Sequence, residues 1–328
     1  MVETPPMPAP PADAAPSHHP ATVTIPLWRR LFPFALATAL VAVILLRLDI
    51  GLFVQQLGHA NYPGLFVFAT TITFLLLTAD TFATVGIYRR TVCPISFRQL
   101  FVLRAASYLP SLLNHHVGQA WLTYFLSKVY RAPLWRVAGA TLLTYATTLG
   151  CLLLFGVLAV PFNSERIRWL VPLLVALTGL ALLYLGAIAA KPRFMHAWAA
   201  TAPLVEVGVR GHLIAFVYRI PHMIVLFAGS WLVFWFFGIG IPLGHALATV
   251  PLLMLVAGLP VTPQGVGTRD LLAVQLFSQY AAGTPEARRA AIVAATLSWA
   301  CALTLVQLVI SSLFMRKARR LLNAELRL

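Results

Sequence analysis

The chain has 328 residues, of which 60% are hydrophobic and only 10% are charged, and its mean hydropathy is +0.84. Soluble domains carry roughly 25% charged residues, so this composition excludes a soluble fold and indicates an all-α, polytopic membrane bundle. The net charge of +15 does not predict nucleic-acid binding, because the basic residues are scattered between apolar segments. Anionic lipid at the cytoplasmic surface is the partner that this charge favours.

The two ends of the chain are predicted to be cytoplasmic tails. Residues 1–26 are rich in proline and alanine and lack the basic start of a signal peptide, so we expect a disordered tail. Residues 316–328 form a basic tail. Cys93, Cys151 and Cys301 are far apart and match neither a metal-site spacing nor a disulfide framework. The sequence therefore predicts no metal and no cofactor.

Apolar segments long enough to cross a bilayer occur about six times. They are Leu31–Ile50, Gly64–Tyr88, Val137–Val160, Trp169–Ala190, His212–Gly238 and Ala290–Met315. Two further apolar stretches are interrupted. Gln99–Ser127 is broken around Pro110 and Gly118, and His245–Tyr280 is broken at Pro260–Gly267.

The distribution of basic residues predicts how the two interrupted stretches are inserted. If each returns to the side that it entered from, five of the 24 basic residues fall outside and Arg269 falls in a broken segment, which leaves 18 inside. The outer five are Arg47, Arg166, Arg168, Arg288 and Arg289. The charges thus favour two re-entrant hairpins and cytoplasmic termini, in the inner membrane of the cell.

The same topology predicts an inverted repeat. Residues 27–160 and 161–315 each contain two spans, a hairpin and a third span, and the halves have opposite orientation. Such repeats place substrate sites near the midplane, where broken helices meet. This prediction depends on topology, because the halves share no convincing residue-level similarity.

Arg269 and Asp270 are the leading candidates for a site, because charged residues at membrane depth are costly and mark functional positions. Adjacent helix residues do not face each other, so we expect separate partners for them. Gly265 and Gly267 let the backbone turn tightly beside a helix that we expect to begin at Leu271, which would form an anion site for a phosphate head group. The alternative is a structural arginine that extends to the surface and an aspartate that caps a helix.

The first hairpin supplies the other candidates, Arg104, Asn114, His115 and Gln119, as the polar lining of a cavity. Its adjacent histidines point about 100° apart on a helix and lack acidic or thiol neighbours, which argues against zinc. Asp80 lies inside a span, where it could pair with a hairpin arginine or carry a proton. Arg219, near the expected inner end of its span, is predicted to extend to the surface.

Two motifs resemble a known family. Pro260–Asp270 resembles the signature Pro-x-Ser-Pro-Gly-Gly-x-Gly-x-Arg-Glu of the flippase-like family that includes the transmembrane region of lysylphosphatidylglycerol synthases. Pro263, Gly265, Gly267 and Arg269 match it, Asp270 is a conservative replacement, and Gln264 replaces a glycine. Arg104–Gly118 is similar to the family's first signature through Leu109, Pro110 and Gly118, but Gln119 stands where an acidic residue is usual, and Trp121–Thr123 contain no arginine.

The resemblance implies movement of a phospholipid or lipid-linked intermediate between leaflets. The residues show no hydrolase, kinase, phosphate-loop or zinc-protease motif, so we expect no enzyme and no catalytic residue. A secondary transporter of a small anion is one alternative. A membrane subunit of a lipid-modifying complex is the other, with a lipid-synthesis enzyme or a second copy of the chain as partner.

Overall fold

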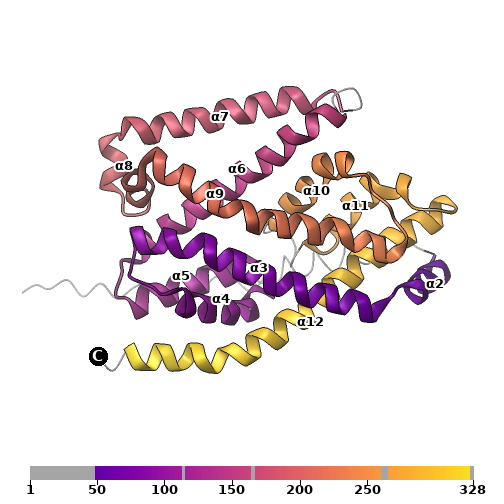
Figure 1. Cartoon of the computed structure of the whole chain (residues 1–328), viewed down its shortest axis with the longest axis horizontal. Coiled ribbons are helices and arrows are strands. Elements are labelled where there is room, and N and C mark those ends of the chain that lie inside the picture. The colour runs from indigo at the N-terminus through magenta and orange to yellow at the C-terminus, as the bar shows by residue number, and fades with distance from the viewer. Residues whose placement is uncertain (1–48, 113–114, 164–166, 260–264, 326–328) are drawn as a thin grey trace, which may run out of the picture.

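The computed structural model describes residues 49–112, 115–163, 167–259 and 265–325, and every regular element in these ranges is a helix (Figure 1). The elements are α2 (Ile50–His59), α3 (Tyr62–Thr91), α4 (Phe97–Ser111), α5 (His115–Val129), α6 (Leu134–Asn163), α7 (Leu170–Ala190), α8 (Arg193–Ala197), α9 (Ala202–Leu232), η1 (Val233–Phe237), α10 (Leu243–Gly258), α11 (Thr268–Phe277), η3 (Ser278–Tyr280) and α12 (Pro285–Glu325). The predicted all-α bundle is confirmed.

Five helical segments in the described ranges are long and apolar enough to cross a membrane. They are Tyr62–Thr91, Leu134–Asn163, Leu170–Ala190, Ala202–Phe237 and Pro285–Leu321, and each contains most or all of one predicted span. The predicted first span lies outside the described residues except for its last two, as does the tail of residues 1–26. Ile50 instead begins α2, a helix that we did not predict, and the Asp49 carboxylate caps it by accepting from the Leu52 amide at 3.0 Å.

The two interrupted stretches form helix pairs at different ends of the bundle. Figure 1 shows α4 and α5 at the end where α3 and α12 finish, and α10 and α11 toward the end where α12 begins. Insertion of these pairs into a membrane from opposite sides, and the inverted repeat of residues 27–160 and 161–315, stay predictions.

Gly118 permits the close approach of α4 and α5. A Cβ atom at this position would lie 1.7 Å from the Ser111 hydroxyl oxygen and 2.9 Å from the Ser107 carbonyl oxygen. No other residue fits there without moving one of the helices. The glycine in the first motif thus has a direct steric cause.

The last helix completes the hydrogen bonding of α4 at its proline. Pro110 has no N–H, so the carbonyl of Ala106, four residues earlier, lacks its usual helical partner. The Ser311 hydroxyl of α12 donates to this carbonyl at 2.9 Å and accepts from the Leu109 amide at 3.1 Å. Because a buried carbonyl without a partner is costly in an apolar medium, this contact stabilises the break.

Two glycines shape the start of α11. Gly265 and Gly267 have φ of 73° and 88°, which confirms the predicted tight backbone turn. The helix begins at Thr268, not at Leu271 as predicted, because the Asp270 carboxylate accepts from the Gly267 amide at 2.9 Å and so caps a helix that starts one turn earlier.

Candidate functional site

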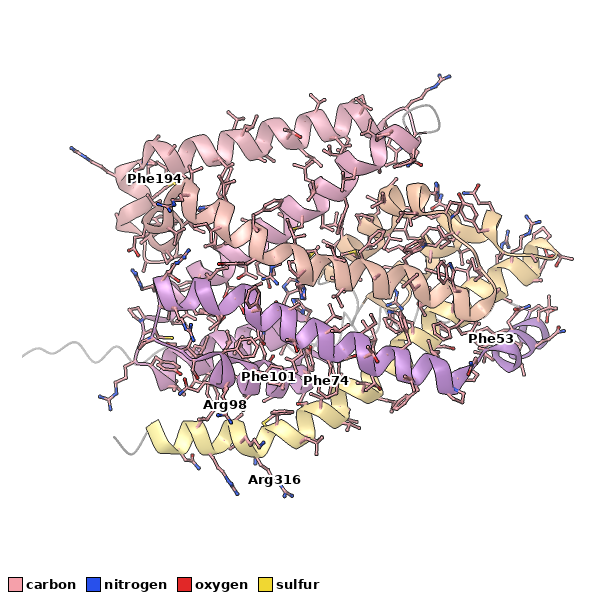
Figure 2. All side chains as sticks on the ribbon, viewed as in Figure 1. Phe53, Phe74, Arg98, Phe101, Phe194 and Arg316 are labelled. Carbon is pink, nitrogen blue, oxygen red and sulfur yellow. The ribbon has the colours of Figure 1, made fainter. Side chains whose placement is uncertain are left out.

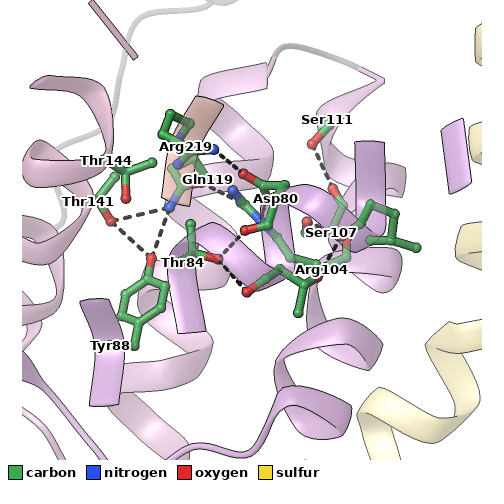
Figure 3. A network of polar contacts seen from close by, with 12 residues as sticks. Asp80, Thr84, Tyr88, Arg104, Ser107, Ser111, Gln119, Thr141, Thr144 and Arg219 are labelled. Atoms are coloured by element: carbon green, nitrogen blue, oxygen red, sulfur yellow. Dashed lines mark hydrogen bonds and ion pairs between the residues drawn. The ribbon is translucent and has the colours of Figure 1, made fainter. Parts of the chain in front are cut away.

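The centre of the candidate site is the carboxylate of Asp80, in the middle of α3 (Figure 3). One oxygen, Oδ2, accepts a short hydrogen bond from Nε of Arg104 on α4, and the other, Oδ1, accepts from Nη1 of Arg219 on α9 at 2.6 Å. The pairing of Asp80 with an arginine of the first hairpin was one of the predicted alternatives. The pairing with Arg219 was not predicted.

Gln119 of α5 extends this network to α6. Its side-chain oxygen accepts from Arg104 Nη1 at 2.5 Å, and its side-chain nitrogen donates to the Tyr88 hydroxyl at 3.3 Å and to Thr141 Oγ1 at 3.2 Å. Figure 3 shows these groups converging between the helices. We call the set Asp80, Arg104, Gln119 and Arg219 the Asp80 cluster; it joins α3, α4, α5 and α9.

The Asp80 cluster carries one carboxylate and two guanidinium groups, and therefore a net charge of +1. Arg219 is 2% exposed, Gln119 6% and Arg104 8%. A buried charge without a counterion costs several kcal/mol, so a surplus positive charge favours an anionic partner. Gln119, at the position where the first motif usually has an acidic residue, leaves this charge uncompensated.

Part of the Arg219 guanidinium has no hydrogen-bond partner among the described residues. Its Nη1 bonds Asp80, but Nε and Nη2 are buried and unpaired. These two nitrogens lie on one edge of the planar group, the edge that binds carboxylate or phosphate oxygens in pairs. The Asp80 cluster therefore contains two buried donors that lack an acceptor among the described residues.

Arg269 and Asp270 form a second, separate ion pair. Arg269 Nη2 donates to Asp270 Oδ1 at 3.1 Å and to the Thr296 carbonyl of α12 at 3.0 Å, although we had expected separate partners for the two side chains. Each side chain does have a partner of its own, since Asp270 also accepts from the Gly267 amide, but the direct contact between the two was not expected. Asp270 is fully buried. The opposite charges of the two side chains cancel, and the hydrogen bond to Thr296 attaches α11 to α12.

The structure brings together only part of the predicted site. Asp80, Arg104 and Gln119 are in contact, whereas the contacts of Arg269 and Asp270 are those of the second pair, beside Gly265 and Gly267. His115 is exposed, and its ring lies 5.8 Å from that of His116. Asn114 lies outside the described residues. Among the residues that are described, no group of three or more His, Cys, Asp or Glu side chains could hold a metal ion.

Arg219 is the residue that sequence reasoning missed. We had placed it at the surface because the apolar window of its span began at His212. α9 runs from Ala202 to Leu232 with a kink at Gly208, so Arg219 lies in the middle of the part that follows the kink, and it is buried. The signal in the sequence was Asp80: one carboxylate in an apolar span needs a cation from another span, and Arg219 lies inside such a span.

A family model described as the lysylphosphatidylglycerol synthase TM region matches residues 30–311. The chain belongs to this family. The match spans both interrupted stretches and every residue of the Asp80 cluster, and it confirms the resemblance seen in the two motifs. Membership in the lysylphosphatidylglycerol synthase TM region family makes the chain a multi-pass, lipid-related membrane protein. No match was found among curated proteins or solved structures.

Proposed function

We propose that the protein is a lipid translocator, which moves an anionic phospholipid or a lipid-linked intermediate between the leaflets of the inner membrane and catalyses no covalent reaction. The family membership supports a lipid substrate. The observation that carries the proposal is the unpaired Nε–Nη2 edge of Arg219 inside a buried cluster of net charge +1.

A phosphodiester fits this edge better than a neutral head group does. Its two non-bridging oxygens accept the two parallel N–H groups, and its charge cancels that of the cluster. The Asp80 carboxylate holds Arg219 by Nη1 and so fixes the direction of the unpaired edge. The acyl chains remain in the surrounding lipid while the head group passes between the helices.

The roles of the remaining residues follow from their contacts. Arg104 supplies the second positive charge of the cluster, and Gln119 orients Arg104 by accepting a hydrogen bond with its side-chain oxygen. Arg269 has a buried Nε without a partner among the described residues, and it supplies a second donor on the other hairpin. In this proposal both termini face the cytoplasm.

The test is lipid movement in vesicles that contain the full chain and fluorescent phosphatidylglycerol, with dithionite quenching of the outer leaflet. Arg219→Gln removes the charge and is expected to slow movement at least tenfold. Arg219→Lys keeps the charge but loses the paired edge, and we expect it to be nearly as slow. Arg316→Gln is the matched control, because Figure 2 shows Arg316 projecting away from the bundle. Arg269→Gln is measured in the same assay.

Wild-type rates in both Arg219 variants would overturn the assignment. A melting temperature equal to that of the wild type shows that the variants are folded. Uptake of labelled phosphate without lipid movement would instead support the transporter of a small anion. If neither lipid nor phosphate moves with the wild-type chain, the result supports a non-transporting membrane subunit.

A further inference from the structure

A groove runs between α3 and α9, which lie side by side in Figure 1. Its wide end has a volume of about 330 Å³ and is bounded by Arg90, Glu206, Val207, Arg210, Gly211 and Ile214. Its narrow end continues along Ala83, Gly86, Ile87, Leu143, Ala215 and Tyr218. The groove is thus polar at one end and apolar at the other, like a phospholipid.

The wide end carries a net positive charge. Arg90 and Arg210 are exposed, and neither forms an ion pair with any residue that the structure describes. The one carboxylate of the lining, Glu206, is already neutralised: Arg136 donates two parallel hydrogen bonds to it, at 2.9 and 2.5 Å. Two arginines therefore remain available to an anion.

The narrow end has a volume of about 20 Å³, and small residues form part of its wall. Ala83 and Gly86 on α3 face Gly211 and Ala215 on α9, and a Cβ atom added at Gly86 would meet nothing within 4 Å. A side chain at this glycine would therefore enter free space without displacing a neighbour.

The groove approaches the Asp80 cluster. Ala83 follows Asp80 by three residues on α3, and Ala215 precedes Arg219 by four residues on α9. Residues with these spacings share one face of a helix and lie one turn apart. The apolar end of the groove thus stops about one turn from the two residues that form the buried ion pair.

We infer that this groove binds an anionic phospholipid, with its phosphate between Arg90 and Arg210 and one acyl chain along Gly86 and Gly211, and that it is the route by which lipid reaches the Asp80 cluster. The role of the groove as a route rests on the proposed function, whereas the binding of lipid in the groove does not. Charge complementarity at the wide end selects an anionic over a zwitterionic head group.

Native mass spectrometry of the full chain, purified with either phosphatidylglycerol or phosphatidylcholine, measures the lipid retained. The wild type is expected to prefer phosphatidylglycerol. The double variant Arg90→Gln, Arg210→Gln should lose roughly tenfold or more of its phosphatidylglycerol binding while binding of phosphatidylcholine stays unchanged. Arg316→Gln should leave both unchanged. Equal retention of both lipids by wild type and double variant would overturn the inference.

Gly86→Leu tests the apolar end. Leucine favours a helix over glycine and enters free space, so the fold is retained, but the side chain fills the groove. We expect reduced retention of both lipids. Gly179→Leu is the matched control, since Gly179 on α7 also has nothing within 4 Å of an added Cβ and does not line the groove. Equal retention in the two variants would contradict an acyl chain at Gly86.

The dithionite assay on the same variants separates the groove from the proposed function. If the wild type retains phosphatidylglycerol in the groove but moves no lipid, the binding inference stands and the translocator is wrong. If Gly86→Leu loses retention but moves lipid at the wild-type rate, the translocator stands and the groove is not its route.

Discussion

The ring of His116, at the start of α5, bonds the backbone carbonyl of Gly258, at the end of α10, with Nε2 and the oxygen 2.7 Å apart. The other ring nitrogen lies 3.1 Å from the Tyr145 hydroxyl of α6. The two interrupted stretches therefore touch where each is broken, and His116 links both to the third helix that packs beside them.

Cysteines introduced at His116 and Gly258 test this contact. In a chain with Cys301→Ser, which removes the exposed native thiol and leaves the buried Cys93 and Cys151, a short bismaleimide should join the two positions in high yield. Cysteines at His116 and Gly179 of α7 provide the control pair and should not react with each other. Cross-linking is read as a shift in the gel mobility of a fragment after proteolysis between the two sites, and equal yields in both pairs would contradict the arrangement.

Ser311→Ala should destabilise the protein, because the carbonyl of Ala106 then loses its donor in a buried position. The expected loss is about 1–3 kcal/mol, measured by thermal unfolding in detergent. The neighbouring Ser312 is exposed, and its hydroxyl donates to Leu308 of its own helix at 2.8 Å, so Ser312→Ala is the matched control with little effect.

The substitution Pro110→Ala provides a second test of the role of the Ser311 hydroxyl. Alanine restores an N–H four residues after Ala106, so Ser311→Ala should cost much less in the Pro110→Ala background than alone. Additive effects of the two substitutions would show that the hydroxyl does not replace the missing helical hydrogen bond.

Gln119→Glu should weaken the binding of anionic lipid. The new carboxylate accepts from Arg104 as the amide oxygen does, and it brings the charge of the Asp80 cluster to zero. We expect roughly a tenfold loss of phosphatidylglycerol binding, measured by native mass spectrometry, with the melting temperature retained or raised. Gln279→Glu, an exposed substitution of the same kind, should leave binding at the wild-type level. Stronger phosphatidylglycerol binding by Gln119→Glu would exclude charge attraction as the basis of the site.

Asp80→Asn should be strongly destabilising, because it leaves two buried guanidinium groups without a counterion. The expected loss is on the order of 3–5 kcal/mol, again from thermal unfolding. Asp80→Glu, which keeps the charge, should retain more of the stability than Asp80→Asn. If the two variants have the same melting temperature, the ion pairs with Arg104 and Arg219 contribute little to the stability of the fold.

Most of the long helices could be predicted from the length of the apolar segments alone. The window that begins at Trp169 lies within one residue of α7, because that helix is apolar from end to end. The window that begins at His212 leaves out the first part of α9, which carries Glu206 and Arg210 and is kinked at Gly208, where φ is 61° and ψ is −176°. The misplacement of Arg219 follows directly from that difference.

The sequence predicts a contact of the candidate site only where a charged residue in an apolar span needs a counterion. Asp80 in an apolar span required a cation, and Arg104 in the hairpin was an available one. The choice between one partner and two depends on helix packing, which no local pattern encodes. The hydrogen bond from Arg269 to Asp270 was not predicted, because the rule that adjacent helix residues do not face each other takes no account of the length of the arginine side chain.

The bond between Ser311 and Ala106 joins residues 205 positions apart in the chain. The ribosome adds Ala106 long before it adds Ser311, so during biosynthesis the carbonyl of Ala106 has to wait for the donor that it has in the complete fold. The first hairpin therefore reaches its mature form only after the final helix has been translated. Nascent chains that stop short of residue 311 should consequently be recognised as immature by quality-control proteases.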